Sequence, residues 1–147
     1  MIELARVLRS ETAQAVVRLR GLTEAEAARS RGQGKWVKKE ILGHLIDSAA
    51  NNHQRFVWAQ FNDPFAWPEY EQERWVQIHR YRDRPWLELV DLWAALNAHV
   101  AVVIEGMPEG KLQTQCRIGD LEPTSLEGLM QGYMQHMRHH LDQLGGE

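Results

Sequence analysis

The sequence predicts an all-α protein, a four-helix bundle whose helices are joined by long crossover links. Three observations predict it. Four long stretches repeat apolar residues at helical spacing, no stretch alternates convincingly as a strand does, and two long connections separate the later helices. The 147 residues fit a single domain over positions 1–147, and 44% hydrophobic with 25% charged residues is ordinary for a globular protein.

The first helix is expected over residues 2–20, where leucines and valines recur at roughly helical spacing. Gly21 ends it, because glycine is a common residue at helix C-termini. Thr23 is then expected to cap a short helical turn, with Glu26 three residues on as in a capping box. Residues 31–34 form a loop.

The second long helix is expected to begin near Trp36 or Val37 and to continue to about Phe61. Prolines then break the pattern, and residues 62–84 read as a long connection with one or two helical turns around 71–81. A link of this length between helices is unusual in a compact domain, so we expect it to cross over the bundle and to carry function.

The third long helix is expected to begin after Asp83, a plausible N-cap, with Pro85 in its first turn. It ends at Gly106, and residues 107–123 form the second connection. Within that connection the alternation is too weak to predict a strand. Thr124 or Ser125 caps the last helix, which is expected to end at Leu144.

Charge and composition exclude several classes of function. A net charge of −3 gives no reason to expect nucleic acid or an anionic membrane as a partner. A single cysteine, Cys116, excludes an internal disulfide framework and a CxxC zinc site. We see no signal peptide in residues 1–22 and no apolar run approaching the roughly 20 residues of a membrane span. The expectation is therefore a cytoplasmic protein.

The last helix carries the most informative pattern. His136 and His140 stand four apart, so they share one helix face at the spacing with which two imidazoles hold one metal ion. Both fall on the apolar stripe of that helix, whereas His139 lies off its centre. The stripe consists of Leu126, Leu129, Tyr133, His136, His140 and Leu144. Burying two imidazoles without partners costs about 1–3 kcal/mol each, a cost that a metal ion removes.

The second helix supplies the third candidate ligand, His44, at the border of its apolar face. Ser48, Asn52 and Arg55 follow on the same side, where a bundle normally places Leu or Ala. These polar residues predict a polar pocket that extends from His44 between the helices. Two ligands from one helix and one from another would leave open positions on the metal for water or a substrate atom.

Two further residues are expected to orient the ligands from outside. Asp47 stands three residues after His44, and Gln143 stands three residues after His140. The alternative interpretation is that the histidines are hydrogen-bonded core residues without metal. A second alternative is that His99, near the edge of the third helix's stripe, replaces one of the three ligands.

Two blocks of sequence resemble the DinB-like superfamily, which includes the bacterial damage-inducible DinB proteins. The first is GKWVKKEILGHLIDS over residues 34–48, and the second is TSLEGLMQGYMQHMRHHLDQL over residues 124–144. Their order and spacing match the family pattern over essentially the whole chain. There are two departures: Val37 stands where the family often has Ser or Thr, and the segment before the last helix lacks a histidine that some relatives have.

The resemblance implies a four-helix bundle of the DinB/YfiT-like type and one divalent metal ion, zinc or nickel, held by His44, His136 and His140. It also implies a homodimer. Some members of the superfamily are transferases and isomerases that use bacillithiol or mycothiol, so the first functional hypothesis is a metal-dependent transferase with a small-molecule substrate and a low-molecular-weight thiol. On this hypothesis Asn52 and Arg55 hold carboxylates of the cosubstrate.

Two alternatives stay open. The first is a metal-dependent hydrolase, which needs a general base beside the metal, and Asp47 is the only carboxylate near in pattern. The second is a non-catalytic, stress-related protein whose metal secures the bundle or which acts through an interaction. A catalytic site needs a cavity open at the metal, whereas a structural site is closed.

Overall fold

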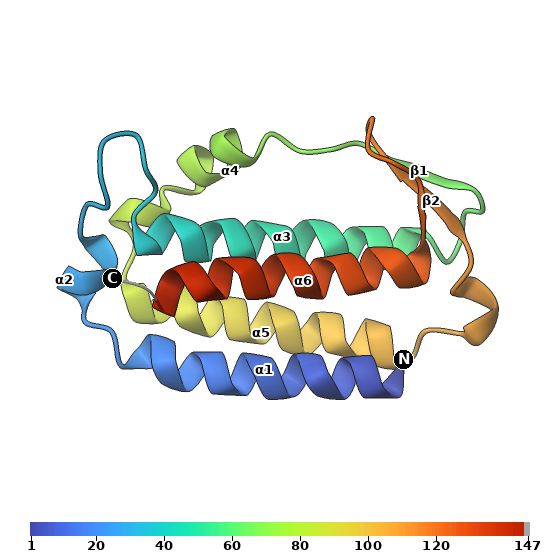
Figure 1. Ribbon diagram of the computed structural model, residues 1–147, viewed down its shortest axis with the longest axis horizontal. Helices are drawn as coiled ribbons and strands as arrows, with labels where there is room; N and C mark the ends of the chain where they lie inside the picture. The colour runs from blue at the N-terminus through green and yellow to red at the C-terminus, as the bar shows by residue number, and fades with distance from the viewer. Residues whose placement is uncertain (146–147) are drawn as a thin grey trace.

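The computed structural model of the protein describes residues 1–145, and four long helices lying side by side make up its body (Figure 1). These are α1 (Ile2–Arg20), α3 (Lys38–Trp58), α5 (Trp86–Glu105) and α6 (Leu126–Gly145). The prediction of an all-α four-helix bundle is therefore confirmed. The first helix has the predicted bounds, and the second begins one or two residues later and ends three residues earlier than predicted.

Helix direction explains why one link is so long. In Figure 1, α3 and α5 run the same way along the bundle, whereas α1 and α6 run the opposite way. The chain must therefore return along the length of the bundle after α3 before α5 can begin. Residues 59–85 make this crossover along the outer side of α3. The link between α5 and α6 stays at one end of the bundle.

The crossover carries a short helix, as predicted. This is α4 (Gln72–His79), which lies against α3 and is followed by a single 3-10 turn, Tyr81–Asp83. Another short helix, α2 (Glu24–Ala28), joins α1 to α3, and Thr23 and Glu26 form the predicted capping box at its start. A second 3-10 turn, Glu109–Lys111, follows α5.

The expectation of no strand is wrong. Three short strands, β1 (Phe65–Trp67), β2 (Gln115–Ile118) and β3 (Thr124–Ser125), form one sheet in the order β1-β2-β3. β1 pairs with β2 in parallel, and β2 pairs with β3 in antiparallel orientation. The sheet joins the two long links to each other at one end of the bundle (Figure 1). Strands of two to four residues leave too little alternation to detect in sequence.

The start of α5 differs from the prediction, and the start of α6 decides between two predicted caps. α5 begins after Pro85, not after Asp83, and its first N–H, that of Trp86, donates to the carboxylate of Glu24, 2.8 Å away. A distant side chain replaces the local cap, which local spacing does not reveal. At α6, of the two predicted caps, Ser125 is the one whose hydroxyl accepts a hydrogen bond from the N–H of Gly128.

The helix α5 corrects a second expectation, because it is long and apolar enough to cross a membrane by length and composition alone. In the structure it packs along both α1 and α3, and Trp93 and Val100 are fully buried there. Trp86 is also buried, and its indole N–H donates to the Leu19 carbonyl, 2.7 Å away. α5 is thus the core helix of the bundle.

Candidate metal centre

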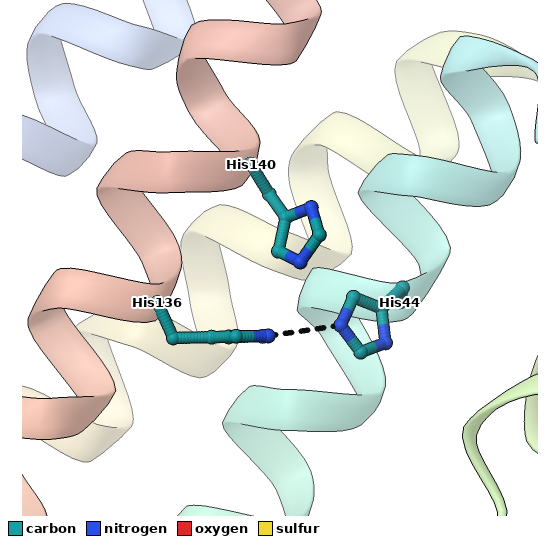
Figure 2. Close-up of side chains that lie close together, drawn as sticks. All are labelled: His44, His136 and His140. Carbon is teal, nitrogen blue, oxygen red and sulfur yellow. Dashed lines mark hydrogen bonds between the residues drawn. The ribbon is translucent and has the colours of Figure 1, made fainter.

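Three histidines from two helices meet between α3 and α6. His44 comes from α3, and His136 and His140 come from consecutive turns of α6. One ring nitrogen of each points toward a common space (Figure 2), and these nitrogens all lie within 4.8 Å of one another. The Nε2 atoms of His44 and His136 are 3.0 Å apart. The structure therefore brings together the three residues that the sequence pattern selected.

Burial keeps these rings neutral. His44 is 1% exposed, and loss of solvent, with the positive charge that His136 and His140 would carry, lowers the pKa of His44 to about 3. Burial, with the positive charge that His140 and His139 would carry, lowers the pKa of His136 to about 4, and burial also lowers the pKa of His140. A neutral imidazole has one lone pair, which is the form that binds a metal ion.

Contacts behind two of the rings fix which nitrogen carries that lone pair. The Nδ1 atom of His140 lies 2.8 Å from the amide oxygen of Gln143, which can only accept, so Nδ1 carries the proton. The Ser48 hydroxyl lies 3.5 Å from Nδ1 of His136. With its proton on Nδ1, His140 has a free lone pair on Nε2, which can bind a metal ion. His136 has the same free lone pair on Nε2 when its Nδ1 donates to the Ser48 hydroxyl. Gln143 thus lies where the sequence placed it.

Within residues 1–145, Asp47 makes no hydrogen bond to a ligand ring. Its Oδ1 atom accepts a 2.6 Å hydrogen bond from the hydroxyl of Tyr81 and lies 3.1 Å from Nδ1 of His79. Burial raises the pKa of Asp47 to about 6, against the opposite effect of Tyr81 and His79. The expectation that Asp47 orients His44 is therefore replaced: this carboxylate holds the crossover segment against α3.

His99 is not an alternative ligand. It is exposed on α5 and stacks on His53, with ring centroids 4.4 Å apart. His139 is exposed as expected. Within residues 1–145, the one group of histidines, cysteines and carboxylates close enough to share an ion is that of His44, His136 and His140.

A cavity of about 310 Å³ opens beside His136, and Ser48, Asn52 and Arg55 line it as the sequence predicted. We call it the Arg55 cavity. The crossover contributes Glu69 and Tyr70 to its lining, both of which the sequence analysis missed. Nothing in their local pattern marks them, because they reach the cavity only through the path of the long link. Its remaining lining residues are Gln72, Ile118, Leu121, Thr124, Gly128, Leu129, Gly132 and Tyr133.

A second cavity, of about 240 Å³, opens beside His140. Its lining includes Arg31, Lys35 and Trp36 from the loop before α3, together with Gln143. We call it the Lys35 cavity. The Trp36 ring also covers His44, with ring centroids 5.1 Å apart. The histidine cluster therefore lies between two cavities, both open to solvent.

The donor set fits a metal ion. Two nitrogens bound to one ion at about 2.0–2.1 Å lie at most about 4 Å apart, so the His44 and His136 nitrogens already satisfy this limit. One nitrogen of each of the three rings lies within 4.8 Å of the others, so three imidazole lone pairs can meet at one ion. Three neutral imidazoles suit zinc, nickel, copper or iron.

Comparison with known proteins assigns the family. The sequence pattern of the DinB superfamily matches residues 8–144, so the chain belongs to the DinB superfamily. A protein of Geobacillus thermodenitrificans (strain NG80-2), named "Putative metal-dependent hydrolase", is 26% identical over 125 residues. The match covers 84% of this chain and 70% of that protein.

Solved structures share the fold. YfiT from Bacillus subtilis, described as a probable metal-dependent hydrolase with an unusual four-helix bundle topology, superposes with a TM-score of 0.82 at 18% identity. That match covers 95% of this chain and 80% of YfiT. A mycothiol-dependent maleylpyruvate isomerase superposes with a TM-score of 0.77 at 14% identity, over 99% of this chain but only 59% of the isomerase. At these identities the likeness concerns the fold.

Proposed function

We propose that the protein is a metal-dependent enzyme in which His44, His136 and His140 hold one divalent ion, zinc or nickel. The observation that carries the proposal is the position of the histidine cluster between two solvent-open cavities. A metal that only secured the bundle would need no access from solvent, so this arrangement speaks against the purely structural alternative. Such an ion would lower the pKa of a thiol or water brought to its open position and make it a better nucleophile.

The two cavities favour group transfer with a low-molecular-weight thiol. A transferase must admit a thiol cosubstrate and an electrophile together, whereas a hydrolase needs room for one substrate and water. The mycothiol dependence of the similar isomerase supports a thiol of this type. We assign to Ser48 and Gln143 the role of holding the ring tautomers of His136 and His140, and to the cavity walls that of orienting the two substrates.

Hydrolysis is the second candidate, because the Geobacillus relative is named "Putative metal-dependent hydrolase" and YfiT is described as a probable metal-dependent hydrolase. The described residues around the cluster favour hydrolysis less than thiol transfer, because they do not provide a clear general base. Asp47 is the only carboxylate that the sequence pattern offered as a general base, and its Oδ1 atom is engaged by Tyr81 and His79, while its Oδ2 atom is buried. The one carboxylate in the Arg55 cavity is that of Glu69, which is exposed at the rim. A hydrolase of this geometry would have to use a base supplied by its substrate.

Metal content is the first test. Mass spectrometry of untagged protein should find about one divalent ion per chain, and His44→Ala, His136→Ala and His140→Ala should each lose it. His139→Ala is the matched control, because this neighbouring histidine is exposed and outside the cluster. Equal metal content in wild type and all four variants would contradict the metal site.

The thiol step has its own test. Bacillithiol or mycothiol added to cobalt-substituted protein should produce a thiolate-to-cobalt absorption band, and the S-methylated thiol should not. The His136→Ala variant should give no band. If millimolar thiol leaves the cobalt spectrum of the wild type unchanged, thiol-dependent transfer is wrong even where the metal site stands.

A further inference from the structure

Arg55 is a buried cation for which residues 1–145 provide no ionic partner. It is 8% exposed, and its Nε atom is buried and makes no hydrogen bond. Within the described chain no carboxylate reaches it within 4.0 Å, and its one close aromatic neighbour is Tyr70, with the guanidinium 5.8 Å from the ring centroid. Glu69 acts on it only at longer range. A guanidinium has five donors, so this arrangement leaves its binding capacity largely unused.

The contrast with the other buried cation is informative. Lys39 is 5% exposed, and it forms an ion pair with Glu24. The fold therefore provides a counter-charge for a buried cation where that cation has a structural role. A buried charge without such a partner is costly and persists where something outside the chain supplies the opposite charge. Burial lowers the pKa of Arg55, but guanidinium stays charged at neutral pH.

The position of Arg55 shows where a negatively charged ligand would bind. Arg55 lines the same cavity as His136. Ser48, whose hydroxyl lies 3.5 Å from His136, precedes Arg55 by seven residues on α3, which is about 10 Å along a helix. A molecule that extends from the histidine cluster through this cavity along α3 therefore meets the guanidinium about two helical turns away.

We propose that Arg55 is the binding residue for a carboxylate on the substrate or cosubstrate whose reactive end lies at His136. This proposal deepens the proposed function, since it names the chemical class of the ligand of that same site. The ligand has a carboxylate about 10 Å from its reacting atom. Its acid group pairs with the guanidinium fork, which matches a carboxylate through two parallel hydrogen bonds.

The cavity lining favours a carboxylate over a phosphate. Among the residues described as lining it, Arg55 is the one cation, and Glu69 adds a negative charge at the rim. The single guanidinium neutralises the one charge of a carboxylate, whereas a phosphate dianion would keep one negative charge without a partner in the cavity. The amide nitrogen of Asn52 donates to the carbonyl and the hydroxyl of Ser48, at 2.9 and 3.3 Å, so Arg55 is the donor on which the proposal rests. That Asn52 shares the carboxylate stays a prediction.

The test is a titration followed by nuclear magnetic resonance of the Arg55 Nε–H signal. Hexanoate, hexan-1-ol and inorganic phosphate are added separately to the full chain as purified and again after chelation of metal. We expect hexanoate to shift the Arg55 signal saturably in both states, hexan-1-ol to leave it unchanged, and phosphate to act more weakly than hexanoate. Arg55→Gln should weaken hexanoate binding roughly tenfold to a hundredfold, measured by calorimetry.

Arg117→Gln is the matched control, because Arg117 is exposed on β2, beside the cavity-lining Ile118, and the substitution removes the same charge. Its affinity for hexanoate should equal that of the wild type. An Arg55 signal that ignores hexanoate, or a stronger response to phosphate, overturns the proposal. The titration is repeated without metal, so it tests carboxylate binding at Arg55 separately from metal binding. Absence of a metal site would refute the proposed function but would not change the outcome of this titration.

Discussion

The Nε2 atoms of His44 and His136 lie 3.0 Å apart, although 92 positions separate the two residues in sequence. At this distance the two nitrogens either share a proton or face a common ion. A shared proton satisfies one pair and leaves His140 unmatched, whereas one ion satisfies all three rings. The stability of the bundle should therefore respond to metal.

Metal binding is expected to stabilise the fold through His140 as much as through His44. At free zinc about one hundredfold above its dissociation constant, the free energy of unfolding should rise by about 2.7 kcal/mol. Urea unfolding with zinc and with chelator measures the difference. His140→Ala should remove the gain and His139→Ala should keep it. A gain that survives in His140→Ala would place the ion elsewhere.

The metal-free protein is expected to lose stability as the pH falls. The folded-state pKa values of His44 and His136, about 3 and about 4, lie below the ordinary value of 6.5, so the unfolded chain takes up protons first. The stabilising contribution of the neutral rings is fully present above pH 6.5 and is lost as pH falls toward these values. His44 alone contributes a slope of about 1.4 kcal/mol per pH unit in this window.

Unfolding by urea at several pH values in chelator measures that slope, and His44→Gln should reduce it. Asp47 contributes in the opposite sense, because its pKa is raised from 3.8 to about 6 and its share of stability is lost as pH rises through that range. The Asp47→Asn variant therefore separates the two effects. If the stability of the Asp47→Asn variant were independent of pH between about 4 and 6.5, the burial of neutral rings would be contradicted.

Gln143 should tune metal affinity without deciding whether metal binds. Its amide oxygen accepts the Nδ1 proton of His140 at 2.8 Å, and loss of such a contact typically weakens a metal site tenfold to a hundredfold. Gln143→Leu should therefore raise the zinc dissociation constant by roughly this factor, measured by competition with a zinc-binding dye. Gln143→Glu, which keeps an acceptor, is the control. Unchanged affinity in Gln143→Leu would remove its orienting role.

The cluster was predictable because its signals are local. Helix periodicity alone places His136 and His140 on one face, and the polar column of Ser48 to Arg55 marks the facing side of α3. The same spacing rule succeeded for Gln143 and failed for Asp47. Two side chains three residues apart on a helix point about 60° away from each other. Whether the second one contacts the first therefore depends on which neighbouring segment packs against it.

What the sequence could not give depends on the path of the two long links. The sheet forms because Phe65 pairs with Cys116, in segments that are separated by the whole of α4 and α5. Tyr70 reaches the cavity and Tyr81 reaches Asp47 by the same crossover. These contacts depend on how the two links lie over α3 and against each other. No periodic pattern within either link predicts them.

Gly43 is expected to be intolerant of a side chain. A Cβ atom there would lie 2.0 Å from Cδ2 of Tyr81, so the ring would have to move and its bond to Asp47 would break. Gly43→Ala should lower the free energy of unfolding by about 2–4 kcal/mol. Gly132→Ala, where a Cβ meets nothing within 4 Å, should raise it by up to about 1 kcal/mol. Equal effects would deny that Tyr81 is fixed against α3.

Arg55 is expected to lower the stability of the fold while it provides ligand binding. Because its buried charge lacks a partner within the described chain, Arg55→Met is expected to raise the free energy of unfolding by about 1 kcal/mol or more while hexanoate binding is lost. Lys39→Met, which breaks the ion pair with Glu24, should give no such gain. Urea unfolding of both variants makes the comparison. A destabilised Arg55→Met would mean that the guanidinium serves the fold, and its unpaired state would then need another explanation.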